Sequence, residues 1–243
     1  YNSEYEIINS GYKGKLYLEI TTKTFDILFS TGNKLNQLRV KNGNIKYLND
    51  KDLEKINKKE SLLFDDKGNS INLSVNNGLK IKADISNKDI VIAYKAKKKS
   101  SPIIFDKINY YKVKDFWKPI FKKNNDFIII EPNEFYILKS KEKIKILPNL
   151  AAEMLPYETD IGEFRVHYAG FFDPGFGYEN EGSYAVLEIK TYEVSFAIQN
   201  GQNIARLMFD KLQKVPSKLY GKNIKSNYQN QGLALSKHFI LNI

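Results

Sequence analysis

The sequence predicts a mainly β fold. Short runs of Ile, Val, Tyr, Phe and Leu alternate with breaks of Gly, Asn, Asp and Lys, a pattern typical of strands joined by turns. The 243 residues are 42% hydrophobic and 13% aromatic, which is enough for a packed core. The predicted strands span residues 15–20, 25–30, 35–40, 89–94, 126–131, 134–139, 163–168, 183–190, 193–199, 203–212 and 237–241.

Helical signals are few. Asn49 and Asp50 form an N-cap signal that predicts a helix over residues 52–58. A weaker pattern predicts a second helix over residues 113–121. Its Trp117 is interpreted as a packing residue rather than a ligand contact.

Composition excludes several kinds of chemistry. The chain has no cysteine, so disulfides, thiolate metal sites and cysteine nucleophiles are excluded. Its two histidines, His167 and His238, are too few for a three-histidine zinc site. The lack of cysteine makes a cytosolic location the default expectation. No run approaches the length of a membrane helix, and the first residues lack the layout of a secretory signal, so we predict no membrane partner. The start without Met suggests a fragment or a processed form.

The formal net charge of +10 favours anionic partners such as polyphosphates or nucleic acid. Codon bias towards Lys, Asn and Ile is the preferred explanation of the charge, because the lysines are spread along the whole chain. The basic residues are not interleaved with aromatic residues on one recognisable face, so nucleic acid is the weakest candidate partner.

An internal repeat is the strongest sign of organisation. Leu18-Glu19-Ile20 recurs as Leu187-Glu188-Ile189, Gly32 recurs as Gly201, and Leu38 recurs as Leu207, all at an offset of 169 residues. We therefore predict that residues 1–58 are the end of a first β domain plus a connecting helix. Residues 59–243 would form a complete second copy with a C-terminal tail.

Three stretches carry candidate chemistry. Asp173-Pro174-Gly175 is a tight-turn signal that can also be a plain hairpin. Glu188 stands inside an apolar strand, and its pKa would rise if the side chain faces inward but not if it faces solvent. The tail at 219–232 is rich in amides and phenols, which suit hydrogen bonding to a base. A polar, glycine-punctuated loop without a binding role would have the same composition.

Together and in this order, these stretches resemble the dCTP deaminase branch of the dCTP deaminase and dUTPase superfamily. That branch has D-P-G-[FW]-x-G, then [TV]-L-E, then a Gly turn with I-x-Q-L-x-F, and a Tyr- and Gln-containing tail. The sequences at 162–177 and 226–239 are similar to those of the longer, tandem-repeat members. The resemblance implies a dUTPase-like distorted β-barrel, or β-clip, with the first copy truncated. It also implies hydrolysis of dCTP to dUTP and ammonia, which feeds dUMP and dTTP synthesis. The common nucleobase deaminases need Cys and His zinc ligands, so deamination here would proceed without zinc.

The resemblance also implies roles for single residues. The Glu of the L-E pair is the general acid/base in the family, which corresponds to Glu188 and, in the first copy, to Glu19. The nucleotide-binding Gln corresponds to Gln37, whereas Arg206 replaces it in the second copy. The remaining nucleotide contacts are expected at Tyr220, Gln231 and Asp173.

Two departures complicate the second copy. The family's S-S-x-x-R loop for the triphosphate is missing at 155–160, where two acids stand instead, and Phe171 replaces an Arg. We therefore expect a composite site in which Glu19 and Gln37 of the first copy meet the tail, and we favour Glu19 over Glu188 as the catalytic carboxylate. Mg²⁺ is expected to arrive with the triphosphate, and a homo-oligomer is expected.

Two other functions stay open from the sequence. A dUTP diphosphatase, alone or combined with deamination, could use Asp173 to activate water. A non-catalytic nucleotide-binding domain would explain the lost phosphate loop. Release of pyrophosphate alongside ammonia would indicate the first, and binding without turnover the second.

Overall fold

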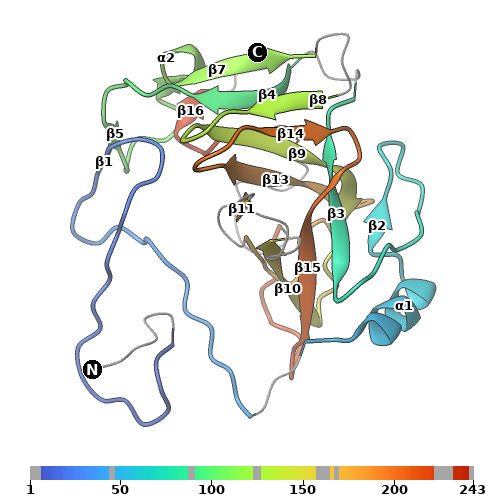
Figure 1. The fold of residues 1–243 in the computed structure, drawn as a ribbon. Coiled ribbons are helices and arrows are strands. Elements are labelled where there is room, and N and C mark those ends of the chain that lie inside the picture. The colour runs from blue at the N-terminus through green and yellow to red at the C-terminus, as the bar shows by residue number, and fades with distance from the viewer. Residues whose placement is uncertain are drawn as a thin grey trace.

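The computed structural model describes residues 7–43, 47–86, 91–122, 127–156, 165–166, 170–221 and 232–240. Strands dominate these residues, which confirms the predicted mainly β fold (Figure 1). In chain order the elements are β1 (Ile27–Leu28), α1 (Asp50–Lys59), β2 (Leu63–Phe64), β3 (Leu79–Asp84), β4 (Val91–Ala96), β5 (Ile103–Ile104), β6 (Tyr111–Lys112), α2 (Val113–Phe116), β7 (Trp117–Phe121), β8 (Phe127–Ile130), β9 (Phe135–Ile144), β10 (Leu150–Pro156), β11 (Arg165–Val166), β12 (Phe171–Phe172), β13 (Ser183–Lys190), β14 (Phe196–Gln199), β15 (Asn203–Lys211) and β16 (Phe239–Ile240).

The largest sheet in the described part of the chain has ten strands, and β9 organises it. One edge of β9 pairs with β13 along most of its length. The other edge is shared by β4, β3 and β2 in succession. Because β4, β3 and β2 pair with successive parts of one edge of β9, the sheet curls. From β3 the pairing continues to β15 and then to β10 on the far side of the curl (Figure 1).

The two faces of β9 and β13 cover different cores. Alternation along β13 buries Ala185, Leu187 and Ile189 completely, and they belong to the large core inside the curl. The opposite face carries Val186, which packs against a second, smaller cluster. That cluster is rich in aromatic rings in edge contact: Phe25 lies 5.1 Å from Trp117 and 6.2 Å from Phe239, measured between ring centroids.

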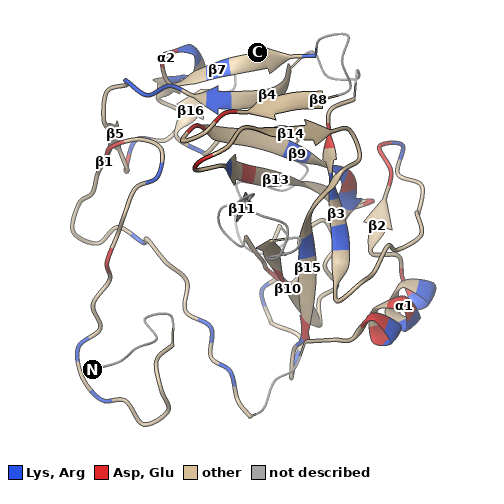
Figure 2. Ribbon diagram, in the orientation of Figure 1, with Lys and Arg blue, Asp and Glu red and all other residues tan. Residues whose placement is uncertain are grey.

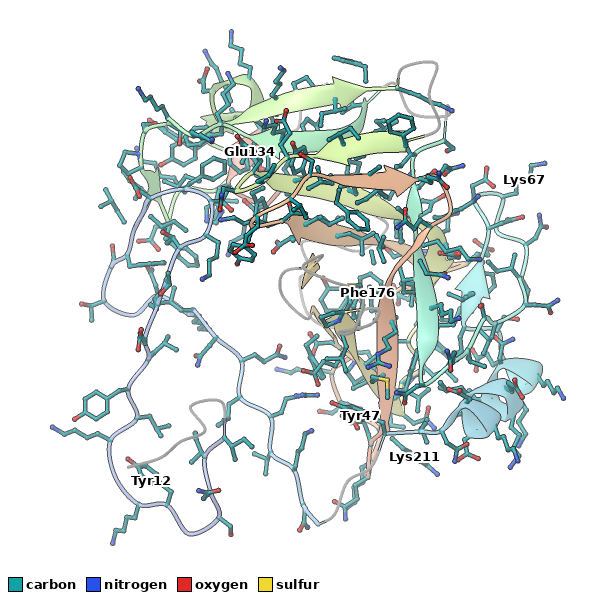
Figure 3. All side chains as sticks on the ribbon, in the orientation of Figure 1. Tyr12, Tyr47, Lys67, Glu134, Phe176 and Lys211 are labelled. Atoms are coloured by element: carbon teal, nitrogen blue, oxygen red, sulfur yellow. The ribbon has the colours of Figure 1, made fainter. Side chains whose placement is uncertain are left out.

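Residues 7–43, called here the N-terminal arm, extend away from the sheet for much of their length, with most side chains exposed (Figure 1). Tyr12 projects from the far end of the arm, well away from the sheet (Figure 3). The strands predicted at 15–20 and 35–40 are wrong, because no described strand lies beside them to pair with their backbone. The arm is held instead by β1, which pairs in parallel with β5, and by buried Phe25.

The predicted helix at 52–58 is confirmed as α1. Asn49 caps it by accepting a hydrogen bond from the Asp52 backbone N–H at 3.0 Å. Acidic side chains occupy its first turn and basic ones its last, as the helix dipole favours (Figure 2).

The second predicted helix is wrong beyond its first turn. Within the predicted range 113–121, only the four residues of α2 are helical. Residues from Trp117 onward form β7, because β4 offers them a backbone partner. Trp117 is buried in the smaller cluster, as predicted for a packing residue. No helix in the described ranges is both long and apolar enough to cross a lipid bilayer.

Candidate active site

Glu188 lies on the face of β13 that points away from the large core. Its neighbours Leu187 and Ile189 are fully buried, and Glu188 is only partly exposed on the other side. Across the sheet it stands opposite Ile137 of β9, which is buried in the smaller cluster. The strand period thus places one carboxylate on an otherwise apolar surface.

A cavity of about 540 Å³ opens on this surface. Three parts of the chain surround it: the sheet with Glu188, the N-terminal arm, and residues 232–240 near the C-terminus. Its lining comprises Thr21, Thr22, Lys23, Thr24, Phe25, Ile27, Ile103, Trp117, Phe135, Ile137, Phe171, Phe172, Asp173, Phe176, Val186, Glu188, Tyr220, Ala234, Leu235, Ser236, His238 and Phe239. The volume and the mostly apolar lining with a few polar groups are typical of small-molecule sites.

Burial raises the pKa of Glu188 from 4.5 to about 7. The cause is loss of hydration, which disfavours the carboxylate form. A group that titrates near neutral pH can both take up and release a proton under physiological conditions. This is the property expected of a general acid/base.

The Asp173-Pro174-Gly175 signal forms the predicted turn. The Phe176 N–H donates to the Asp173 carbonyl at 3.1 Å, and Gly175 has φ +96°, a conformation that side chains disfavour. Phe176 is buried in the interior of the molecule, 5.0 Å from Phe172 between ring centroids (Figure 3). The Tyr220 N–H donates to the Pro174 carbonyl at 2.9 Å, so the turn carries both Asp173 and Tyr220 to the cavity.

Two side chains fasten the arm beside the cavity. Gln37 Nε2 donates to Asp173 Oδ1 at 3.0 Å. Arg39 pairs with Glu153 at 3.0 Å and lies 4.3 Å above the ring centre of Phe171. Sequence reasoning assigned a role to Gln37 but missed Arg39. The structure brings Gln37 to a cavity residue, although Gln37 itself does not line the cavity.

The C-terminal tail, residues 232–240, closes another side of the cavity. Leu235 and Phe239 are buried in the smaller cluster, and β16 pairs in parallel with β6. Between them, Ser236 and His238 face the cavity. Burial lowers the pKa of His238. Sequence analysis gave Ser236 and His238 no role, because nothing in their spacing marks them apart from an ordinary tail.

The preference for Glu19 over Glu188 is not supported by the geometry. Glu19 is exposed on the arm and does not line the cavity, because within the described ranges no strand lies beside residues 15–20 to bury them. Arg206 also lies elsewhere. It stands on β15, where it reaches the Asn77 carbonyl at 3.5 Å. Gln231 lies outside the described residues.

Charge is sparse around the cavity. Among its lining residues Lys23 is the one cation, and it is flanked by Thr21, Thr22 and Thr24. Over the rest of the described chain, lysine and arginine are scattered on the arm, α1 and the sheet rather than gathered on one element (Figure 2). No group of three or more acidic or histidine side chains that could hold a metal ion occurs within the described ranges.

A cavity on a curled β sheet, lined by a partly buried acid and mostly apolar side chains, is typical of a small-molecule site, and the comparisons assign the family. The model of the C-terminal domain of 2′-deoxycytidine 5′-triphosphate deaminase matches residues 49–239, and the model of the N-terminal domain of that family matches residues 1–44. The chain belongs to the 2′-deoxycytidine 5′-triphosphate deaminase family.

A solved structure gives the same assignment. The crystal structure of 2′-deoxycytidine 5′-triphosphate deaminase from Agrobacterium tumefaciens is 37% identical, with a TM-score of 0.63. The alignment covers 70% of this chain but only 51% of that one, so the chain spans about half the length of its solved relative. No curated protein sequence matches the chain.

Proposed function

We propose that the protein hydrolyses dCTP to dUTP and ammonia, with Glu188 as the general acid/base. The observation that carries this proposal is the Glu188 carboxylate, which lines a mostly apolar cavity and has its pKa raised to about 7. Family membership supports the choice of reaction and substrate.

The chemistry requires a proton acceptor and then a proton donor at one position. Water attacks C4 of cytosine, and the Glu188 carboxylate takes the proton that the water loses. Glu188 passes this proton to N3, then takes the remaining proton of the added hydroxyl and passes it to the amino group. The C4–N4 bond breaks, ammonia leaves as the C4 carbonyl forms, and the hydrogen on N3 stays in the product. One positioned acid/base contributes roughly 10²–10⁴ in rate. The cavity contributes the remainder by orienting the water and excluding bulk solvent.

The triphosphate belongs at the polar rim of the cavity. Lys23 supplies a positive charge there, and the three neighbouring threonines supply hydroxyl donors. This arm segment would replace the Ser/Arg loop that the second copy lacks. Mg²⁺ would arrive as part of the substrate, held by phosphate oxygens and water.

The arm and the sheet are proposed to be parts of a tandem repeat that share one composite site. Two turns 169 residues apart support this proposal. At the first, the Ser30 N–H donates to the Asn33 side chain at 2.8 Å and Gly32 has φ +90°. At the second, the Gln199 N–H donates to the Gln202 side chain at 2.9 Å and Gly201 has φ +79°. The division at residues 58 and 59 stays a prediction.

The activity is tested by incubating the protein with dCTP and Mg²⁺ and measuring ammonia and pyrophosphate together. We expect ammonia and dUTP without pyrophosphate. Asp173 lines the same cavity and its Oδ1 accepts a hydrogen bond from Gln37, so pyrophosphate is measured to test whether its carboxylate also activates water against a phosphate. Pyrophosphate release would instead support the diphosphatase, and dCTP binding without any product would support a non-catalytic domain.

The pH dependence of the reaction should report Glu188. The carboxylate must be ionised to take the water proton, and its pKa is about 7. We expect kcat/KM to rise about tenfold per pH unit below pH 7 and to level off above it. A profile that is flat from pH 5.5 to 8 would rule out Glu188 as the titrating base.

The same titration can be followed without nucleotide. The pKa of Glu188 is higher in the folded protein than its ordinary value of 4.5, so the folded chain holds more protons between the two values. Its free energy of unfolding should therefore fall by an amount on the order of 2 kcal/mol as pH rises from 4.5 to about 7. Denaturant unfolding of Glu188→Gln should lack this part of the pH dependence.

The expected assembly rests on the resemblance, and the expected location rests on the lack of cysteine. A homo-oligomer, a cytosolic location, and the lack of membrane and nucleic-acid partners stay predictions. Sedimentation at several protein concentrations would measure the first of these.

A further inference from the structure

His238 is a buried histidine that lines the Glu188 cavity, and the proposed mechanism does not use it. Its ring makes two polar contacts. Nε2 lies 3.0 Å from the Phe105 carbonyl oxygen, and Nδ1 lies 3.2 Å from the Ser236 hydroxyl oxygen. Both ring nitrogens therefore have partners, and one of these partners faces the cavity.

The carbonyl fixes the tautomer of the ring. A carbonyl oxygen only accepts, so Nε2 must carry the hydrogen. Burial lowers the pKa of His238 below its ordinary value, which favours the neutral ring. In a neutral ring with hydrogen on Nε2, Nδ1 is an acceptor, and the Ser236 hydroxyl must donate to it.

These hydrogen bonds determine whether the Ser236 hydroxyl acts as a donor or as an acceptor towards a ligand in the cavity. A hydroxyl has one hydrogen and two lone pairs. When the hydrogen is committed to Nδ1, only the lone pairs of the oxygen remain for a ligand. Ser236 therefore presents an acceptor to a ligand in the cavity that Glu188 also lines.

The backbone around Ser236 is held in place. The Phe239 N–H donates to the Ser236 carbonyl at 3.1 Å, and the Tyr111 N–H donates to the His238 carbonyl at 3.0 Å. Leu235 and Phe239, on either side, are buried. The acceptor is thus oriented before a ligand binds, which lowers the entropic cost of recognition.

We propose that Ser236 determines specificity by accepting a hydrogen bond from the 4-amino group of the cytosine. His238 is the positioning residue, because its Nδ1 holds the serine hydroxyl hydrogen and leaves the oxygen lone pairs for the ligand. Cytosine carries a donor at this position, whereas uracil carries the O4 acceptor. The Ser236 oxygen would attract the substrate and repel the oxygen of the product, which favours product release. The inference rests on the proposed function, because Glu188 must act on the same carbon.

The experiment measures dissociation constants of dCTP and dUTP by calorimetry in the Glu188→Gln background, where the consumption of dCTP is strongly slowed. We expect the parent to bind dCTP more tightly than dUTP. Ser236→Ala should reduce that preference about five- to tenfold, the effect of one hydrogen bond. Ser236→Thr keeps a hydroxyl and should retain the preference. His238→Phe should lose it, whereas His238→Asn offers an oxygen to the serine and should recover part of it.

A direct readout of the tautomer accompanies the binding data. Nitrogen-15 NMR of the ring should show a hydrogen on Nε2 and none on Nδ1, and the Nδ1 signal should shift in Ser236→Ala. Unchanged preference in Ser236→Ala with normal folding would overturn the inference while leaving deamination intact. A parent that binds neither nucleotide would overturn the proposed function and the inference with it.

Discussion

Replacing Glu188 with glutamine should reduce ammonia release from dCTP by a factor of about 10²–10⁴. Glutamine has nearly the same size and can still form hydrogen bonds, but it cannot take a proton from water. The apolar surroundings that raise the pKa of Glu188 also leave no neighbouring carboxylate on β13 or β9 to take over, because Val186 and Ile137 stand beside it. The measurement is kcat at saturating dCTP, with circular dichroism to verify the fold.

The matched control is Glu19→Gln, the equivalent position in the proposed repeat. Glu19 is exposed on the N-terminal arm, so the exchange should change kcat less than twofold. The opposite result, with loss of activity in Glu19→Gln and retention in Glu188→Gln, would restore the sequence-based preference for Glu19. It would also mean that the arm adopts another position during catalysis.

Gly177→Ala should be the most destabilising single change in the turn that carries Asp173. Gly177 has φ +65°, and an added Cβ would lie 2.3 Å from the Ile144 carbonyl oxygen and 2.7 Å from the Ser183 nitrogen. Ile144 and Ser183 are paired across β9 and β13, so neither can move without breaking the strand pair that supports Glu188. We expect a loss of about 3–5 kcal/mol in the free energy of unfolding, measured by denaturant titration.

Gly201→Ala separates the steric effect from the backbone conformation. Gly201 has φ +79°, but an added Cβ would meet only the tip of the Lys141 side chain at 3.5 Å. Its cost should stay near the 1–2 kcal/mol of the left-handed conformation alone. Equal losses at both positions would show that the close approach at Gly177 contributes nothing.

Local sequence patterns predicted the elements whose cause is local. The Asn49 cap and the acidic first turn define α1 within a few residues, because the cap supplies its own hydrogen bond. The Asp-Pro-Gly turn forms for the same reason. The predicted strand at 183–190 matches β13 in both bounds, since its alternation expresses two chemically different faces.

Strands that depend on distant partners were less predictable. Residues 15–20 and 35–40 look like strands but remain unpaired on the arm within the described chain. β3 was missed although its Leu79, Ile81 and Ala83 alternate with polar residues, and its bonds go to β9 and β15. β7 was predicted helical because the pairing with β4 outweighs a weak local preference.

By itself the sequence determined the β fold, the family motifs and the pair of candidate carboxylates, because alternation, turn residues and residue identity are local. Only the tertiary structure distinguished the surroundings of Glu188 from those of Glu19, since a pKa is raised by what surrounds a side chain and not by its neighbours in the chain. The tertiary structure alone also shows that Lys23, Ser236 and His238, from opposite ends of the chain, line one cavity.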